Sequence, residues 1–315
     1  MKRDEFIVAL IATYCRYDEL KRCLDCLLVQ TFSVDAVLVL DNARDPEIAK
    51  LAGRYENVHY LPMTDNNGCG AALKAGEEYA FKEYGEELTK LWILDDDAAP
   101  FPNTLQLLLD ASQRTDASLI VPVCSTPEGG VFGFPDPLEK ISKKIKKSFK
   151  QPEDIRKYFG DKFVLIRWAV GVCMLVDAKA VQKFGTHRDD FWMQGDDLEF
   201  SMRLSKLGGA VLIPYIEIPH LYPQSNNVVV ATKGHLLKFC SLLQNLTYIG
   251  LHEMRSWHAI YCMGADYWRF FRTFGWKSSV IVYAVTCLWN GAVLAEPAGR
   301  KSGEKLRQKI NKDFL

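Results

Sequence analysis

The chain has 315 residues, enough for one large α/β domain with an appendage or for two domains. Its 48% hydrophobic and 25% charged residues are typical of a globular protein and argue against wholesale disorder. Lysine plus arginine balance aspartate plus glutamate at 39 each, and this zero net charge argues against a general nucleic-acid-binding protein.

Short apolar runs alternate with helical patterns through the first third of the chain. The predicted strands cover residues 6–12, 37–41, 58–61 and 91–94. The predicted helices cover residues 18–30, a stretch that opens at 45–47, a stretch that ends near 84, and residues 102–114. Strands and helices in alternation predict an α/β fold, with a mainly parallel, doubly wound sheet covered by helices on both faces.

Polar or acidic residues follow three of these strands. Thr13 follows the first, Asp41 ends the second, and Asp95, Asp96 and Asp97 end the fourth. Open α/β sheets bind ligands at the carboxyl ends of their strands, so this edge is a candidate position for a nucleotide, with Asp41 accepting a hydrogen bond from its base.

The acidic triplet has two interpretations. Three adjacent carboxylates repel one another, and packing gives no reason to place them there. A divalent cation bound to a phosphorylated substrate would explain the three carboxylates, because hard cations take oxygen ligands. The alternative is a solvated acidic turn or a helix N-cap cluster, and the triplet alone does not decide between them.

After residue 117 the alternation changes. Further strands are predicted at residues 118–123, 131–134, 163–167, 172–176 and 210–214. The segment 140–150 holds six lysines, with Ile141, Ile145 and Phe149 spaced four residues apart. It is either a solvated basic helix or loop, or a contact for a membrane or an anionic acceptor.

A second acidic group, Asp196 and Asp197, stands at the start of a predicted helix that runs to Leu207. Carboxylates at this position gain from the helix dipole, which would give them a structural role. Alternatively, one of them could be the general base that takes a proton from an acceptor hydroxyl. Trp168 and Trp192 are either acceptor-facing aromatic residues or core residues.

The C-terminal region, residues 231–315, is expected to be a helical, aromatic and basic appendage to a catalytic domain of residues 1–230. The largely apolar stretch 279–294 falls short of the ~20 residues that span a bilayer. Residues 300–312 include six basic residues and one acid. Peripheral membrane contact and a helical appendage or homo-oligomer interface both remain open.

Cysteine usage and the N-terminus bear on location. Nine cysteines without framework spacing, and no visible secretory signal, indicate reduced thiols and a cytoplasmic protein. If the protein binds a membrane peripherally, we expect it on the inner face of the cell membrane. Cys23 and Cys26 form a C-x-x-C inside a predicted helix, and we interpret them as structural thiols.

Five motifs follow one another in a recognisable order. They are Ile11–Arg16, Leu40–Ala43, Asn66 with Gly68, Leu94–Asp97 and Asp196–Phe200. The chain resembles a family 2 inverting glycosyltransferase of GT-A fold over roughly residues 6–225, and is similar to bacterial galactofuranosyl- and rhamnosyltransferases of that family. It departs from the family pattern at Ala12, Cys15 and Cys69, where proline, asparagine and a second loop glycine are usual.

The resemblance implies roles for individual residues. Asp95 and Asp97 would bind Mn²⁺ or Mg²⁺ directly or through the donor, and His220 would complete the metal site. Asp197 would be the catalytic base, with Asp196 beside it, since adjacent acids raise one pKa. The expected donor-binding residues are Thr13, Asp41, Asn66, Gly68, Asp95 and Asp96.

The resemblance also implies a reaction. A sugar would pass from a nucleotide-sugar to a hydroxyl of a cell-surface glycan or lipid-linked acceptor. UDP-galactofuranose is the first candidate donor and dTDP-rhamnose the second. A sugar nucleotidyltransferase is a weaker alternative because Thr13–Arg16 is not a glycine-rich phosphate loop. A non-catalytic nucleotide-sugar-binding protein is disfavoured by the intact acids.

Overall fold

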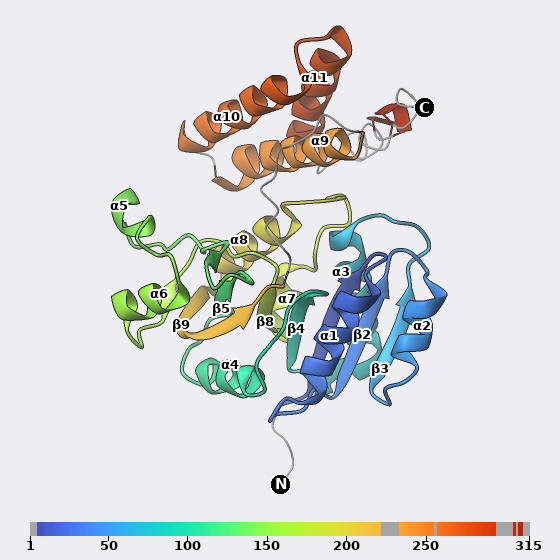
Figure 1. The fold of residues 1–315 in the computed structure, drawn as a ribbon, viewed down its shortest axis with the longest axis vertical. Coiled ribbons are helices and arrows are strands. Elements are labelled where there is room, and N and C mark those ends of the chain that lie inside the picture. Colours follow the sequence, from blue (N-terminus) through green and yellow to red (C-terminus); the bar gives the residue numbers. More distant parts are fainter. Residues whose placement is uncertain (1–4, 222–232, 255–256, 294–304, 307, 311–315) are drawn as a thin grey trace.

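A computed structural model of the chain describes residues 5–221, 233–254, 257–293, 305–306 and 308–310. A large α/β part carries one central sheet, and a smaller group of helices stacks on one end of it (Figure 1). The proposed division between residues 230 and 231 lies outside the described residues.

The sheet combines a parallel half with a mixed half. β1 (Ile7–Thr13), β2 (Ala36–Asp41), β3 (Val58–Pro62) and β4 (Lys90–Asp95) are parallel, in the order β3-β2-β1-β4. β8 (Cys173–Asp177) then lies antiparallel between β4 and β5 (Leu119–Ser125). β9 (Ala210–Pro219) is parallel to β5, while the short β6 (Val131–Phe132) and β7 (Val164–Leu165) pair antiparallel at the margins.

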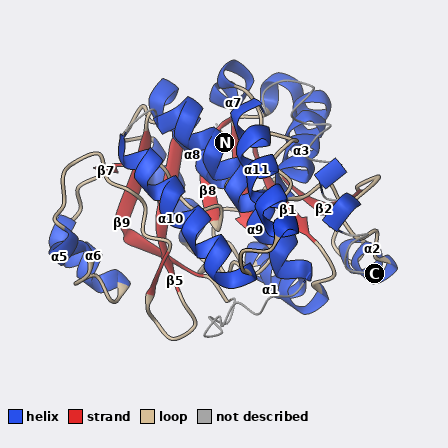
Figure 2. Ribbon diagram, turned by 90° about the horizontal axis from the view of Figure 1, so that it is seen from above, coloured by secondary structure: helices blue, strands red, loops and turns tan. Residues whose placement is uncertain are grey.

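Both faces of the sheet are buried, as Figure 2 shows by the helices that flank the strands. In β1, Ile7, Ala9 and Ile11 point into one core, while Val8 and Leu10 point into the other. This explains why its sequence is apolar throughout rather than alternating. The first core is closed by α1 (Tyr17–Leu28), α2 (Pro46–Ala52) and α4 (Thr104–Ser112).

The second core is closed by four other helices of the α/β part. They are α3 (Cys69–Tyr84), α6 (Pro152–Phe159), α7 (Ala178–Phe184) and α8 (Asp196–Gly208). A 3₁₀ turn (Gly85–Glu87) follows α3. The predicted doubly wound, mainly parallel architecture is therefore confirmed.

The second half of the chain was predicted less completely. Neither α6 nor α7 was expected, because each is short. β9 runs on to Pro219, past the predicted end at residue 214, because a register shift opposite Pro122 and Val123 restores pairing with β5. The predicted strand at residues 163–167 is reduced to β7.

The basic segment 140–150 forms only one short helix, α5 (Lys143–Lys146), capped by the Ser142 hydroxyl. Phe149 is buried, and Ile141 and Ile145 pack against the same core. The apolar side chains of this segment therefore face the protein's own interior, which removes them as a membrane-facing surface.

The C-terminal helices are α9 (Lys233–Tyr248), a π-helical turn (Ile249–Met254), α10 (Trp257–Phe274) and α11 (Ser278–Val293). They dock onto the loop before α8, since Asn245 Nδ2 donates to the carbonyls of Met193 and Gln194 at 3.2 and 2.7 Å. Among the described helices, none is both long and apolar enough to cross a bilayer.

Candidate active site

Strand register brings the predicted polar residues to one edge of the sheet. Thr13 pairs with Asp41, and Ala12 pairs with Asp95. The carboxyl ends of β1, β2 and β4 therefore meet at the same edge, as the sequence pattern predicted.

The centre of this edge is a cluster of Asp95, Asp97 and His220. His220 Nε2 lies 2.9 Å from Asp97 Oδ1 and 3.8 Å from Asp95 Oδ2. One ligand atom from each of the three residues lies within 4.8 Å of the other two. Two carboxylates and one imidazole form a donor set that fits Mn²⁺ or Mg²⁺.

Backbone hydrogen bonds fix His220 against the acidic turn. The His220 amide donates to the Ser125 carbonyl at 2.8 Å, and the Leu221 amide donates to the Asp97 carbonyl at 2.9 Å. The Phe132 ring packs on the imidazole, with centroids 4.4 Å apart. His220 directly follows β9, so this strand places it beside the acidic turn after β4. The contact forms because β9 runs on to Pro219, beyond its predicted end at residue 214.

Arg16 forms ion pairs with Asp96 and Asp97, a role that the sequence did not predict. Its guanidinium contacts Asp96 Oδ1 at 2.9 Å and Asp97 Oδ2 at 2.6 Å. The Thr13 hydroxyl donates to Asp96 Oδ2 at 2.7 Å. Asp96 is thus buried between Thr13 and Arg16, and in this structure its carboxylate anchors the turn.

The environments of the three acids separate their pKa values. Burial raises the pKa of Asp96 to about 6, although Arg16 and Thr13 oppose the shift. Burial would also raise the pKa of Asp97, but the hydrogen bond and charge of His220, followed by Arg16, hold it below its usual range. The pKa of Asp95 is raised by enclosure and by the Asp97 carboxylate. Its side chain is 43% exposed, so it faces the cleft.

Asp41 is fully buried and organises a turn. Its carboxylate accepts hydrogen bonds from the amides of Ala43 and Asp45, at 2.8 and 2.7 Å, and from the Tyr60 hydroxyl at 3.0 Å. Burial and this hydrogen bond raise the pKa of Tyr60 to about 12. The neighbouring Asn42 lines the cleft instead, and its buried Oδ1 has no hydrogen-bond donor among the described residues.

The small-residue loop before α3 contains Asn66 and Gly68, and its shape depends on close contact with Trp192. Gly68 has φ +94°, and a Cβ there would lie 1.6 Å from the Trp192 carbonyl oxygen. The Asn66 side chain accepts from the Gly68 amide, and the Asn66 carbonyl accepts from Trp192 Nε1. Glycine is required here by the approach of Trp192, while Asn66 and Gly68 also line the cleft.

The second acidic pair lies at the start of α8, where Asp196 is buried and Asp197 is partly buried. Asp197 Oδ2 accepts from the Gly171 amide at 3.0 Å, and Oδ1 accepts from the Leu198 amide at 2.8 Å. Burial and the adjacent Asp196 raise the pKa of Asp197 to about 6. Burial also raises the pKa of Asp196, opposed by the charge of His187. The structure therefore combines the N-terminal helix position with a pKa that suits a base.

His187 and Glu77 form a buried pair behind these acids, which the sequence did not predict. His187 Nδ1 lies 2.7 Å from Glu77 Oε1, and the His187 amide donates to Glu77 Oε2 at 2.8 Å. His187 also stacks on Phe200, with centroids 3.7 Å apart. An acid in the middle of α3 and a histidine far along the chain give no sequence signal for this pairing.

Two connected hollows flank Asp95. The open cleft, of 320 Å³, is lined by Thr13, Arg16 and Asn42 together with the Asp95–Asp97–His220 cluster. The deeper hollow, of 210 Å³, contains Asp196, Asp197 and His187. Both are lined by Ala12, Cys69 and Asp95. The Asp95–Asp97–His220 cluster and the acidic pair therefore lie beside neighbouring hollows that share part of their lining.

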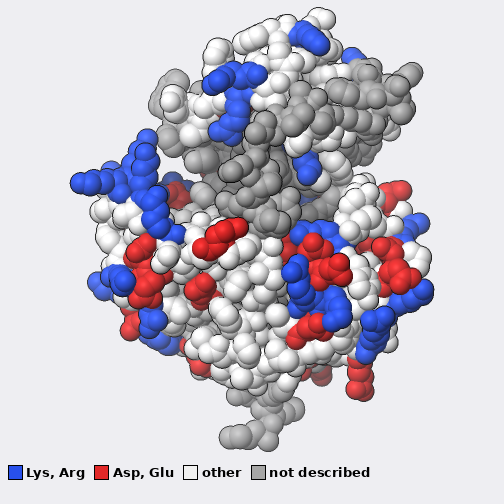
Figure 3. Space-filling model, viewed as in Figure 1, with Lys and Arg blue, Asp and Glu red and all other residues white. Residues whose placement is uncertain are grey.

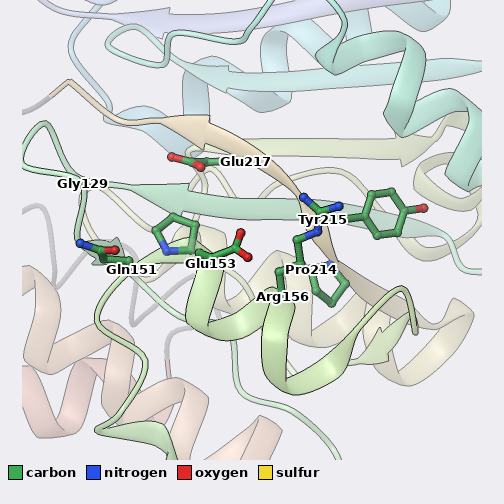
Figure 4. A pocket seen from close by; sticks show the side chains of 8 residues that line it. Gly129, Gln151, Glu153, Arg156, Pro214, Tyr215 and Glu217 are labelled. Atoms are coloured by element: carbon green, nitrogen blue, oxygen red, sulfur yellow. The ribbon is translucent and has the colours of Figure 1, made fainter.

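Two other predicted or visible features lie outside this site. Trp168 is partly buried against a small core that includes Phe191 and Met202, and it lines neither hollow, so its contact with an acceptor stays a prediction. A hollow of 350 Å³ lies between α6 and β9, where Glu153 and Glu217 approach from the two elements (Figure 4). The three cluster residues do not line it, and it is separate from the site described above.

Comparison with known proteins agrees with this geometry. The sequence profile described as Glycosyl transferase family 2 matches residues 8–180, more than half of the chain. The chain belongs to glycosyl transferase family 2. This confirms the resemblance predicted from the ordered motifs.

Two individual proteins are similar to this family 2 member. Galactofuranosyltransferase GlfT1 of Mycolicibacterium smegmatis (strain ATCC 700084 / mc(2)155) is 27% identical over 138 residues, which cover 43% of this chain and 45% of that protein. The match therefore spans less than half of the relative's length. The crystal structure of GalNAc-T7 with UDP, GalNAc and Mn²⁺ superposes with a TM-score of 0.53 at 14% identity, covering 74% of this chain and 48% of that one. This likeness confirms the GT-A type of fold.

Proposed function

We propose that the protein is a divalent-metal-dependent, inverting glycosyltransferase that uses a UDP-sugar. The observation that carries this proposal is the cluster of Asp95, Asp97 and His220, which lines the open cleft and through Asp95 also borders the hollow of the acidic pair. One hollow offers metal ligands and an open cleft for a nucleotide, and the other offers the carboxylate pair Asp196 and Asp197.

The metal would neutralise the negative charge that develops on the leaving diphosphate. Asp95 and Asp97 supply oxygen ligands and His220 supplies a nitrogen ligand. His220 and, after it, Arg16 with its 2.6 Å contact hold the pKa of Asp97 below its usual range, which favours the ionised form that would coordinate the ion. Asn42 lines the cleft and its Oδ1 has no donor among the described residues, so we propose it as an acceptor for the nucleotide base. Direct contact of Asp41 with the base stays a prediction.

Asp197 would remove the proton from the attacking acceptor hydroxyl. The amides of Gly171 and Leu198 hold its carboxylate in a fixed orientation, and Asp196 shares the buried site. Attack on the sugar carbon from the side opposite the diphosphate breaks the sugar–phosphate bond and inverts the anomeric centre. Positioning and charge stabilisation would supply most of the rate enhancement.

We propose galactofuranose as the transferred sugar, since the curated relative is a galactofuranosyltransferase. The UDP and Mn²⁺ present with GalNAc-T7 are consistent with a UDP-sugar and a divalent ion in a fold of this type. Rhamnose from dTDP-rhamnose is the second candidate. The acceptor we propose is a hydroxyl of a cell-surface glycan or lipid-linked glycan, and Trp192, at the junction of the loop 66–68 and α9, is the candidate aromatic contact.

A panel of nucleotide-sugars tests the proposal. The purified protein is incubated with each donor, with and without Mn²⁺ or Mg²⁺ and with a lipid-linked acceptor, and nucleoside diphosphate release is followed. We expect metal-dependent UDP release with UDP-galactofuranose. Pyrophosphate release from a nucleoside triphosphate would instead identify a nucleotidyltransferase, and no release with any donor would overturn the proposal.

A further inference from the structure

An exposed apolar surface covers the outer side of the C-terminal helices. α11 contains no charged residue. One side of it, including Tyr283 and Cys287, is buried against α9 and the C-terminal residues Leu306 and Ile310. The opposite side is exposed yet equally apolar. Its exposed large side chains are Ile281, Val282, Val285, Leu288 and Trp289.

Aromatic residues of α10 and of the following turn extend this surface. Tyr261 and Trp268 are exposed on α10, seven residues apart and therefore on one helix face. Trp276, in the turn before α11, is 61% exposed and stacks on Phe271 with centroids 4.1 Å apart. Together with the α11 residues above, these three form what we call the outer face. An apolar surface of this kind marks a binding site rather than ordinary solvent-exposed surface.

The outer face points away from the catalytic sheet. α10 and α11 both pack on α9, and α9 holds the loop before α8 through Ser241 and Asn245. Figure 1 shows α9 between the sheet and the two outer helices. Whatever covers the outer face therefore lies on the far side of α9 from the sheet.

The charges around the outer face are positive. Between residues 261 and 293 the sequence contains three basic residues, Arg269, Arg272 and Lys277, and one acid, Asp266. Asp266 is largely covered and lies 3.5 Å from Arg269. On the face of the molecule that Figure 3 draws, basic but no acidic side chains are visible among the described atoms of the C-terminal helices.

We infer that the outer face is a docking surface for an anionic lipid membrane. Tryptophan and tyrosine favour the headgroup level of a bilayer, and arginine and lysine favour anionic lipid. At 16 residues, α11 is roughly 24 Å long, short of a bilayer core, so it would lie in the interface. A second copy of the chain fits less well, because no exposed acid of the described outer helices could pair with the partner's basic residues.

Docking itself does not depend on the catalytic reaction. Its consequence for the acceptor rests on the proposed function: the carboxyl edge of the sheet would be held near the headgroups, where a lipid-linked acceptor resides.

Vesicle co-flotation of the full chain tests the inference. We expect binding to vesicles of phosphatidylcholine mixed equally with phosphatidylglycerol, and much weaker binding to phosphatidylcholine alone. Trp289→Glu should weaken binding by more than about tenfold, because it removes an exposed aromatic side chain that the membrane interface would bury and adds a negative charge. Lys277→Glu should weaken binding by roughly fivefold or more, because it removes one attractive charge and adds a repulsive one.

The matched control is Val29→Glu, which adds the same charge at an apolar position that is 59% exposed after α1. It should bind like the wild type, and all variants should keep the wild-type melting curve. Equal binding of wild type and Trp289→Glu would overturn the inference. So would a wild-type dimer that Trp289→Glu converts to a monomer without any vesicle binding. Metal-dependent UDP release without vesicle binding would remove this inference alone, whereas vesicle binding without donor consumption would remove the proposed function alone.

Discussion

Arg16 Nη2 lies 2.6 Å from Asp97 Oδ2, so a residue of the first loop joins His220 in holding the pKa of Asp97 below its usual range. Two consequences follow. Asp97 stays ionised despite its burial, and the second oxygen of the same carboxylate is left facing His220. The loop after β1 is therefore part of the candidate metal site.

Replacing Arg16 with glutamine should destabilise the fold. Asp96 and Asp97 would lose their cation, and we expect the free energy of unfolding to fall by about 1–3 kcal/mol at neutral pH. The pKa of Asp97 is depressed in the folded state, so its contribution to stability is present above the unfolded pKa and is lost as pH falls through the folded pKa. The difference between variant and wild type should therefore shrink in acid.

Urea unfolding at several pH values measures this effect. Lys21→Gln is the control, because Lys21 and Asp25 form an exposed ion pair at 2.6 Å that should contribute little. An Arg16→Gln variant as stable as Lys21→Gln would show that the buried pairing is unimportant.

The metal site predicts a ligand-dependent melting temperature. Mn²⁺ should raise the melting temperature of the wild type, because the ion binds the folded state and relieves repulsion between Asp95 and Asp97. Asp97→Asn and His220→Ala should each lose most of the increase. Differential scanning fluorimetry with and without EDTA measures it, and an undiminished Mn²⁺ effect in both variants would place the ion elsewhere.

Asp197→Asn should lower turnover by about 10²–10⁴-fold, the range typical for loss of a general base. The fold should survive, since burial raises the pKa of Asp197 and its ionised form therefore destabilises the folded state as pH rises through about 6. Steady-state UDP release and a urea melt separate the two effects. Asp196→Asn is the informative comparison, because a larger loss there would reassign the base to Asp196.

The pH dependence of kcat/KM follows from the same residue. Asp197 acts as a base only when ionised, and its pKa is about 6, so activity should fall as pH drops below that value. A profile that stays flat well into the acid range would argue against Asp197. The profile should be measured at saturating metal. Otherwise protonation of the metal ligands in acid would release the ion and lower kcat/KM in the same way as protonation of Asp197.

Gly68→Ala should disturb the site structurally. The new methyl group would collide with the Trp192 carbonyl, so the loop or Trp192 must move, and we expect a loss of more than about 2 kcal/mol. Gly85→Ala is the control, since Gly85 also has positive φ but open space around it, and should cost about 1 kcal/mol. Equal losses in urea unfolding would contradict the role of the Trp192 contact.

Local sequence pattern predicted the parallel half of the sheet well. Apolar runs ending in Thr13, Asp41 and Asp95 specify buried parallel strands, and their common edge follows from topology. The resemblance supplied His220, and the structure brings it to Asp97. What remained unpredicted depends on long-range packing. The Arg16–Asp97 and Glu77–His187 pairs join distant segments, and Phe149 is buried in segment 140–150, for which a solvated helix and a membrane contact had both been open.

The most direct test of the central claim is calorimetric titration of the protein with UDP, once with Mn²⁺ and once with EDTA, in the wild type and in Asp97→Asn. If Asp95, Asp97 and His220 hold the ion that binds the donor diphosphate, UDP should bind the wild type tightly only with Mn²⁺, and Asp97→Asn should lose that dependence along with most of the affinity. Equal UDP affinity in Mn²⁺ and in EDTA would contradict the account.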